Sequence, residues 1–223
     1  MGQYRISELN IEVETNSKTL KKNLQQYETS FDYKPNLVLS MSDDILLQYM
    51  EEYDGYTVDE VECEYLTTEY ARSLFDFNGI SMLGVGVEQD NSAVIFASPF
   101  QQVDVNAYLP QDKVFVVNVP AIRLISQEFF VYDTPFGMHG DKSKHSRLPL
   151  KSIVFVDSER FDSLKRLDTL DMVSMFMRAV MHSIHGERTK HTLYMLEKIM
   201  KKVDFYGVAN LYDAKFILER VTE

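Results

Sequence analysis

The sequence lacks the features that point to secretion, a membrane or a disulfide framework. Its one cysteine, Cys63, cannot pair within the chain or build a thiolate cluster around a structural metal, which agrees with a reducing compartment. No stretch reaches the roughly 18 apolar residues that a membrane helix needs, and the opening MGQYRISELN lacks the basic and then apolar layout of a secretory signal. We therefore expect a cytoplasmic protein in which Cys63 is a small, partly buried side chain.

Basic residues are missing from one long part of the chain. The formal net charge is −11, which disfavours nucleic acid and anionic membranes as partners, because both are bound by clustered Lys and Arg. No Lys or Arg lies between Lys34 and Arg72, where carboxylates accumulate: Asp43, Asp44, Glu51, Glu52, Asp54, Asp59, Glu60, Glu62, Glu64 and Glu69. Such a segment either docks a basic peptide or protein surface or, as is commoner, is a solvated face that keeps the protein soluble.

Length and composition fit one globular core with an appended lobe. The chain has 223 residues, of which 45% are hydrophobic and 26% charged. Periodicity in the first part predicts strands and helices in alternation: strands at 9–13, 37–39 and 61–65, and helices at 20–27, 43–50 and 67–77. Because Asn78-Gly79 favours positive φ, we place a boundary there, between an acidic N-terminal α/β lobe (1–78) and the main core (79–223).

Short runs of β-branched and aromatic residues dominate the core region and predict one sheet. We expect its strands at 82–87, 93–97, 114–117, 122–125, 129–132, 153–156 and 205–211. Asp168 or Thr169 should cap a helix that is apolar around nearly its whole circumference and therefore buried, and further helices should cover 188–202 and 214–218. The predicted fold class is α/β, a mixed β-sheet flanked by helices with a smaller N-terminal lobe.

Three short segments of the core follow one another in a recognisable order. Residues 96–99 (Phe-Ala-Ser-Pro) follow a strand, residues 120–123 (Pro-Ala-Ile-Arg) open another, and residues 132–136 (Tyr-Asp-Thr-Pro-Phe) precede the core strand at 148–156. They resemble the opening of the phosphate loop, the stretch after the metal-binding aspartates and the Gly-Thr-Pro-Trp turn of the HPr kinase/phosphorylase and PEP-carboxykinase-like family of P-loop proteins. The resemblance spans roughly the last two thirds of the chain and implies that family's fold for the core.

The residues with which such kinases hold ATP and magnesium are missing at the matching positions. The family uses loop glycines whose N–H groups wrap the phosphates, a lysine that neutralises them, and a Ser or Thr hydroxyl on magnesium. The resemblance places the three glycines at Ser98, Gln101 and Val103, the lysine at Asp104, the hydroxyl at Val105, and the aspartate pair at Val117 and Asn118. A carboxylate at the lysine position would repel phosphates. We therefore expect no phosphate transfer and no nucleotide or metal cofactor.

Two other patterns are weaker signals of a phosphate site or a metal site. Gly84-x-Gly86 is glycine-rich but lies inside an apolar strand, where glycine permits close packing more often than it cradles phosphate. His182, His185 and His191 are potential metal ligands, yet no carboxylate stands at a metal-motif spacing beside them. Histidines at helix ends that meet the helix dipole or solvent are commoner than ligands.

Two candidate surfaces remain around the matched segments. A remnant pocket is expected outside the carboxyl ends of the strands, and its members would be Ser98, Gln101, Asp104, Asn118, Arg123, Asp133 and Thr134. Asp133 is the acidic residue of this group that could still act as a base. The polar stretch that follows predicts a surface loop suited to binding, with His139, Lys142, Lys144, His145 and Arg147.

Our leading functional hypothesis is a catalytically silent, kinase-like protein that binds a peptide or a protein. The resemblance implies this setting, since members of the family act in pathways that modify ribosomally made peptides or regulate carbon uptake. The alternatives are an enzyme with a remodelled pocket around Asp104, Asn118, Arg123, Asp133 and Thr134, a residual ATP-dependent phosphotransferase, and a structural subunit that forms homo-oligomers. The sequence leaves these alternatives open.

Overall fold

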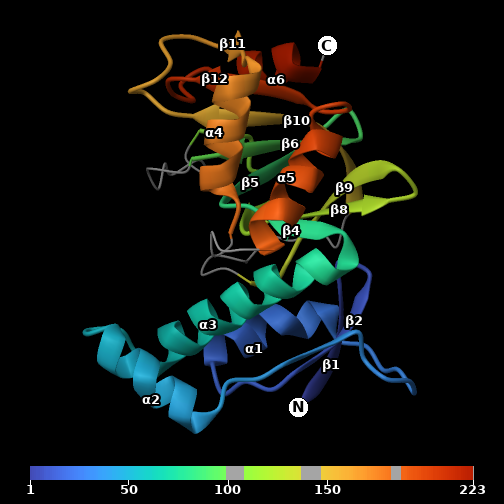
Figure 1. Ribbon diagram of the computed structural model, residues 1–223, viewed down its shortest axis with the longest axis vertical. Coiled ribbons are helices and arrows are strands. Elements are labelled where there is room, and N and C mark those ends of the chain that lie inside the picture. Colours follow the sequence, from blue (N-terminus) through green and yellow to red (C-terminus); the bar gives the residue numbers. More distant parts are fainter. Residues whose placement is uncertain (99–107, 137–146, 182–186, 223) are drawn as a thin grey trace.

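A small lobe and a larger sheet-based core make up the computed structural model (Figure 1). It describes residues 1–98, 108–136, 147–181 and 187–222. The architecture is mixed α/β, a curled mixed β-sheet with flanking helices, as predicted. Within the described ranges, no helix combines the length and the apolar character needed to cross a membrane.

The lobe is built on a β-hairpin at the start of the chain. Strands β1 (Gly2–Ile6) and β2 (Leu9–Val13) pair antiparallel, and β3 (Leu37–Leu39) adds to β2 in parallel. Ser7 and Glu8 turn the chain with φ of 49° and 62°, the positive values that tight hairpin turns require. The strands predicted at 9–13 and 37–39 are confirmed, whereas β1 was not predicted, because Ser-Glu is a weak turn signal compared with Asn-Gly.

Helices α1 (Lys18–Leu24), α2 (Asp43–Glu52) and α3 (Val58–Ser73) complete the lobe. The strand predicted at 61–65 is wrong, because these residues belong to α3. A capping box starts this helix: the Glu60 N–H donates to Thr57 Oγ1 at 3.3 Å, and the Thr57 N–H donates to the Glu60 carboxylate at 2.9 Å. Cys63 on α3 is buried 3.2 Å from Ser17 Oγ, and burial raises the pKa of its thiol.

The core is one large sheet, as predicted, in the order β4-β8-β9-β10-β6-β5-β7 with β12 beside β10 and β11 beside β12. Strands β6, β10 and β12 run parallel, and the other pairs are antiparallel. The strands are β4 (Gly79–Ser81), β5 (Gly84–Gln89), β6 (Ser92–Ala97), β7 (Val114–Asn118), β8 (Ala121–Ile125), β9 (Glu128–Tyr132), β10 (Arg147–Val156), β11 (Lys165–Arg166) and β12 (Asp204–Val208).

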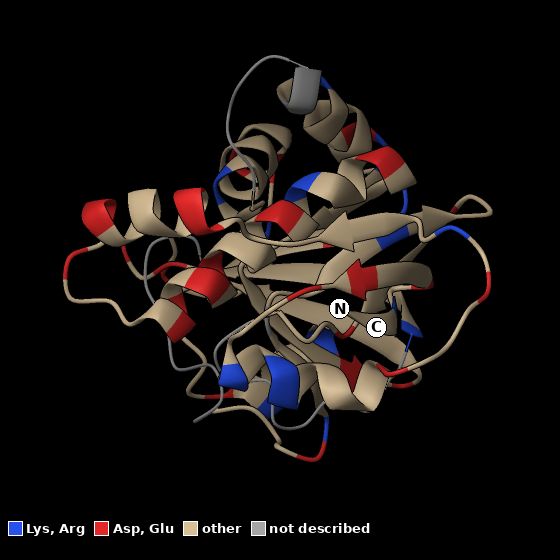
Figure 2. Cartoon of the chain, turned by 90° about the horizontal axis from the view of Figure 1, so that it is seen from below, with Lys and Arg blue, Asp and Glu red and all other residues tan. Residues whose placement is uncertain are grey.

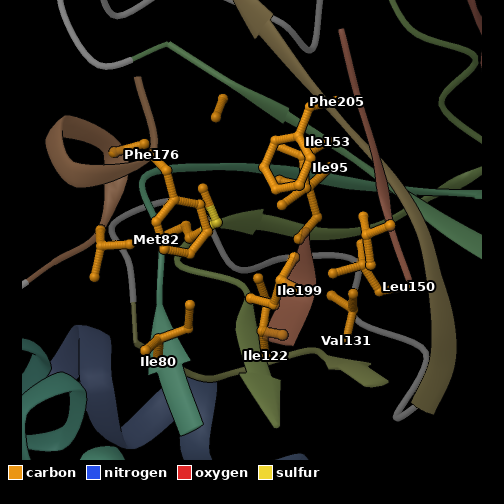
Figure 3. Packing of buried hydrophobic residues seen from close by; sticks show 14 of the residues in the cluster. Ile80, Met82, Ile95, Ile122, Val131, Leu150, Ile153, Phe176, Ile199 and Phe205 are labelled. Atoms are coloured by element: carbon orange, nitrogen blue, oxygen red, sulfur yellow. The ribbon is translucent and has the colours of Figure 1, made fainter. Parts of the chain in front are cut away.

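Strand β10 joins the two parts of this sheet. Its first residues pair with β9, and after a register shift between Leu150 and Ser152 it lies between β6 and β12. Ile153 and Phe155 then belong to one buried cluster, with Phe176 and Phe205 (Figure 3), while Val154 and Val156 belong to a second cluster under α6 (Ala214–Thr222). The sheet therefore has a packed layer on each face.

Helices α4 (Thr169–Ala179) and α5 (Glu187–Ile199) cover the first of these faces. Asp168 caps α4 as predicted, with its carboxylate accepting from the Asp171 N–H at 2.9 Å. The prediction that α4 is buried all round is wrong. Leu170 is 80% exposed, and the buried residues of this helix are Met175, Phe176 and Ala179. An apolar circumference therefore does not bury a helix that packs on the sheet by one face only.

Gly84 and Gly86 serve close packing within the sheet. A Cβ at Gly84 would lie 2.5 Å from the Phe96 carbonyl oxygen, and one at Gly86 would lie 2.4 Å from Val116 Cγ1. A real Cβ atom essentially never makes a non-bonded contact this short. The structure thus agrees with the packing interpretation of this Gly-x-Gly pattern.

Candidate binding cleft between the lobe and the core

The segment after β9 ties the lobe to the core. Phe136 is fully buried and stacks on Tyr70 of α3 with ring centroids 4.3 Å apart. The Asn23 side-chain amide donates to the Pro135 carbonyl at 3.3 Å, and the Tyr27 hydroxyl donates to Asp133 Oδ2 at 3.0 Å. Residues 132–136, which resemble the kinase family's Gly-Thr-Pro-Trp turn, therefore form the docking element for the N-terminal lobe.

Arg123 of β8 is a second connection between the two parts. Its Nη1 donates to the Ser7 carbonyl at 2.5 Å, and its Nε and Nη2 both donate to the Phe77 carbonyl at 3.2 Å. A planar guanidinium suits this task, since its donors point in fixed directions toward two acceptors. Arg123 was predicted to belong to a remnant pocket, and the contacts that the structure shows for it hold the hairpin turn and the end of the lobe.

A cleft of about 340 Å³ lies where the hairpin, the chain just after α1 (residues 26–29) and the docking segment meet. This volume falls near the lower end of the range for small-molecule sites, roughly 300–1,000 Å³. Polar and charged side chains predominate along it: Arg5, Ser7, Glu8, Gln26, Tyr27, Glu28, Thr29, Tyr132, Asp133 and Arg147. None of these lining residues is a glycine or a lysine.

The charges of the cleft are mixed, with carboxylates in excess. Arg147 forms an ion pair with Glu8 of the hairpin turn, and its guanidinium lies 4.5 Å from the centroid of the Phe130 ring. Arg5 donates to the Asn10 side-chain oxygen at 2.9 Å. The carboxylates of Glu8, Glu28 and Asp133 thus line the cleft together with two arginines, Arg5 and Arg147. Such a site suits hydrogen-bonding groups of both charges, and it is poorly suited to a polyphosphate, which carries only negative charge.

Tyr132 lines the cleft, and its buried hydroxyl stays protonated. Burial, together with the negative charge of Glu8, raises its pKa to about 12, although the positive charges of Arg123 and Arg147 act in the opposite direction. Asp133 beside it is buried and accepts from Tyr27. The residue predicted as a possible base is therefore already engaged by a neighbouring donor.

The predicted remnant pocket is divided between two places. Gly84 of β5 pairs with both Ala97 of β6 and Asn118 of β7, which places Ser98 and Asn118 at the same edge of the sheet, on opposite sides of β5. Thr134 Oγ1 donates to the Val119 carbonyl at 2.7 Å, so Thr134 lies near that group. Arg123 and Asp133 instead make their contacts with the lobe. Gln101 and Asp104 lie outside the described residues.

Most of the predicted binding loop, namely His139, Lys142, Lys144 and His145, also lies outside the described residues. Arg147, its last member, lines the cleft. The sequence interpretation missed the cleft's other half, Arg5, Glu8 and Glu28. The family resemblance starts only after the lobe, and a charged residue beside a hairpin turn gives no signal of its own.

No metal site is present at these histidines among the residues that the structure describes. His182 and His185 lie outside those residues, and no group of three or more His, Cys, Asp or Glu side chains in the described ranges could hold an ion. His191 instead packs edge-on against Phe75, with ring centroids 5.2 Å apart. It is therefore a packing residue between α5 and the end of the lobe.

Replacing His191 by Phe should flatten the pH dependence of stability. Burial lowers the pKa of His191, and Asp76 opposes this only in part. The unfolded chain therefore takes up the proton first, so stability is complete above the ordinary value of 6.5 and falls as the pH drops below it toward the folded-state pKa. Urea unfolding at about pH 7.5 and about pH 5.5 measures this. An unchanged pH slope in the variant would contradict the assignment.

Comparison of the sequence with models of protein families gives no match, and comparison with curated proteins gives none either.

Proposed function

We propose that this chain is a catalytically silent, kinase-like protein that binds a peptide or a protein in the cleft between its lobe and its core. One observation carries the proposal. Asp133 and Arg147 line one polar cleft, in which carboxylates outnumber guanidinium groups. Asp133 was singled out by the resemblance to a kinase active site, and Arg147 belongs to the loop predicted to follow it. The scaffold is then retained for recognition, while its charge opposes nucleotide binding.

The chemistry of the cleft fits a peptide better than a nucleotide. Arg5 and Arg147 offer planar donors for a peptide carboxylate, and Glu8 and Glu28 offer acceptors for an amine or a guanidinium. Tyr132 lies beside them, and its hydroxyl is buried and remains protonated at any physiological pH. These groups come from the hairpin, the chain just after α1, the docking segment and the start of β10, so a bound peptide would contact both the lobe and the core.

Calorimetric titration with ATP and magnesium tests the first half of this proposal. We expect no measurable heat, because the cleft has no lysine or glycine-rich loop and its excess carboxylates repel phosphates. Incubation with radiolabelled ATP and a pool of random peptides should likewise leave the peptides unlabelled. Micromolar affinity for ATP, about −8 kcal/mol, or labelling of any peptide would contradict the proposal and restore a kinase.

Selection of a phage-displayed peptide library on the purified protein tests the second half. Binders of the cleft should lose about ten-fold or more in affinity for Arg147→Ala, because a charge-assisted hydrogen bond contributes about 1.5–3 kcal/mol. Arg166→Ala is the matched control, since Arg166 is exposed and pairs with Asp204 away from the cleft. Thermal melts of both variants would show that each is folded. Equal affinity for the wild type and Arg147→Ala would contradict binding in the cleft.

A further inference from the structure

Helix α2 lies at the end of the lobe that is away from the core, beside α3 (Figure 1). None of its residues is buried, although it carries Ile45, Leu46, Tyr49 and Met50. Beyond it the side chains of Tyr53, Tyr56 and Val58 are 40%, 51% and 48% exposed. The apolar residues of α2 are thus only partly covered, and Leu47 is 64% exposed, so the helix has apolar surface available for a partner.

Tyrosine rings form a connected row along this face. Tyr49 stacks on Tyr53 at 5.6 Å and meets Tyr65 of α3 edge-on at 5.4 Å, and Tyr53 meets Tyr56 edge-on at 5.7 Å, all measured between ring centroids. Aromatic pairs at these distances are mutually stabilising, so the rings are held in place before any ligand binds. Tyrosine rings attract cations over their faces. The row therefore offers preformed sites for Lys or Arg side chains.

The charge around these rings has one sign. The ten carboxylates between Lys34 and Arg72 account for all but one unit of the net charge of −11, and Figure 2 shows α2 with Asp and Glu and no Lys or Arg. Some of them have internal roles: the Asp59 carboxylate accepts from the Lys18 N–H, and the Glu62 carboxylate from the Asn16 N–H. Glu51 and Asp54 lie within two residues of Tyr53 in the sequence, and Glu64 precedes Tyr65. No ion pair to a described basic residue involves these three carboxylates.

Other occupants fit this surface less well. No cluster of potential metal ligands is present within the described ranges, so the carboxylates are not arranged for a divalent cation. A polyanion would be repelled. A purely apolar helix would leave Glu51 and Asp54 beside it without a counter-charge, which opposes binding. Charge complementarity and the row of rings both favour a cationic chain.

We propose that α2 and the first half of α3 form a docking surface for an arginine- or lysine-rich peptide segment of a partner protein. In this arrangement the partner's cations lie against the rings of Tyr53 and Tyr56 and pair with Glu51, Asp54 and Glu64. This surface is separate from the cleft, because no residue of α2 or α3 lines the cleft. The inference therefore goes beyond the proposed function and does not depend on it.

Fluorescence anisotropy with a fluorescein-labelled peptide of about 12 residues, Arg alternating with Ser or Gly, tests the proposal. The triple variant E51Q/D54N/E64Q should bind it about ten-fold more weakly at roughly 50 mM salt, and the difference should disappear near 0.5 M salt, where such charges are screened. The matched control is E128Q/D162N/E219Q, which removes three exposed carboxylates elsewhere and should bind like the wild type. A peptide with Gln in place of Arg should not bind.

Ring substitutions separate the aromatic contribution from the charge. Tyr56→Leu should weaken binding about three-fold and Tyr56→Phe less than two-fold, since phenylalanine keeps the aromatic face. Equal losses in both triple variants would show nonspecific attraction to an acidic protein and would overturn the proposal, as would full affinity in E51Q/D54N/E64Q. Arg147→Ala in the cleft should bind this peptide like the wild type. A negative result for peptide binding at α2 therefore does not contradict the proposed function of the cleft. A negative result at the cleft likewise does not contradict docking at α2.

Discussion

Replacing Phe136 by Ala is expected to lower the free energy of unfolding by about 3–5 kcal/mol, the usual cost of emptying a fully buried aromatic site. Phe136 has no exposed surface and shares one cluster with Tyr70, Leu74 and Ile11 of the lobe and with Ala121 of the core. The variant therefore loses packing on both sides of the junction at once. Urea unfolding followed by far-UV circular dichroism measures the change.

The control for this variant is Phe136→Leu, which keeps most of the buried volume. It should cost about 1–2 kcal/mol, because the ring stack on Tyr70 is lost while the site stays filled. If the Ala variant cost less than about 1 kcal/mol, the junction would not be a packed interface. Both variants should leave the peptide affinity of α2 unchanged, since Phe136 is not part of that surface.

Replacing Arg123 by Ala should cost about 3 kcal/mol, because charge-assisted hydrogen bonds contribute about 1.5–3 kcal/mol each when they are partly buried. The substitution leaves the Ser7 and Phe77 carbonyls without their guanidinium donors. The hairpin turn should then be less firmly held to β8. Limited proteolysis near residues 7–8, compared with the wild type, measures this local loosening, and urea unfolding measures the global cost.

Arg123→Lys distinguishes the geometry of the guanidinium from its charge. A lysine has one compact ammonium group and cannot satisfy both carbonyls as the planar fork does, so we expect an intermediate loss. Stability equal to the wild type in the lysine variant would mean that charge alone matters at this position. Stability equal to the wild type in the alanine variant would show that the two carbonyls find other donors.

The strands of the core were the part of the fold that local pattern predicted best. Runs such as Val-Phe-Val-Val at 114–117 are too short and too β-branched for a helix, so their assignment did not depend on partners. The alternation at 61–65 led to a wrong strand prediction, because these residues belong to a helix. That helix is favoured by the capping box of Thr57 and Glu60 and by the burial of Leu66 and Tyr70 further along. A short period-two pattern within a longer helical one is weak information.

The site was only partly predictable. Asp133 and Arg147 were found because a family motif and a loop of basic residues drew attention to them. Their partners Tyr27 and Glu8 lie more than a hundred residues earlier in the chain, and only the folding of the lobe onto the core brings them together. Ordinary polar residues in a hairpin turn carry no mark of such a role. Long-range pairing of this kind depends on tertiary structure, which single-sequence patterns do not contain.

The register of β10 allows no change in length beyond the irregularity between Leu150 and Ser152. Beyond that point Ile153 and Phe155 face one packed layer, and Val154 and Val156 face the other. Deleting or inserting a single residue there would turn each of these side chains to the opposite layer, so that both layers would receive shapes that they cannot accommodate. A change of one residue within this segment alters which layer every later side chain of the strand faces. Variation in chain length among sequences with this fold should therefore be confined to the turns on either side of it.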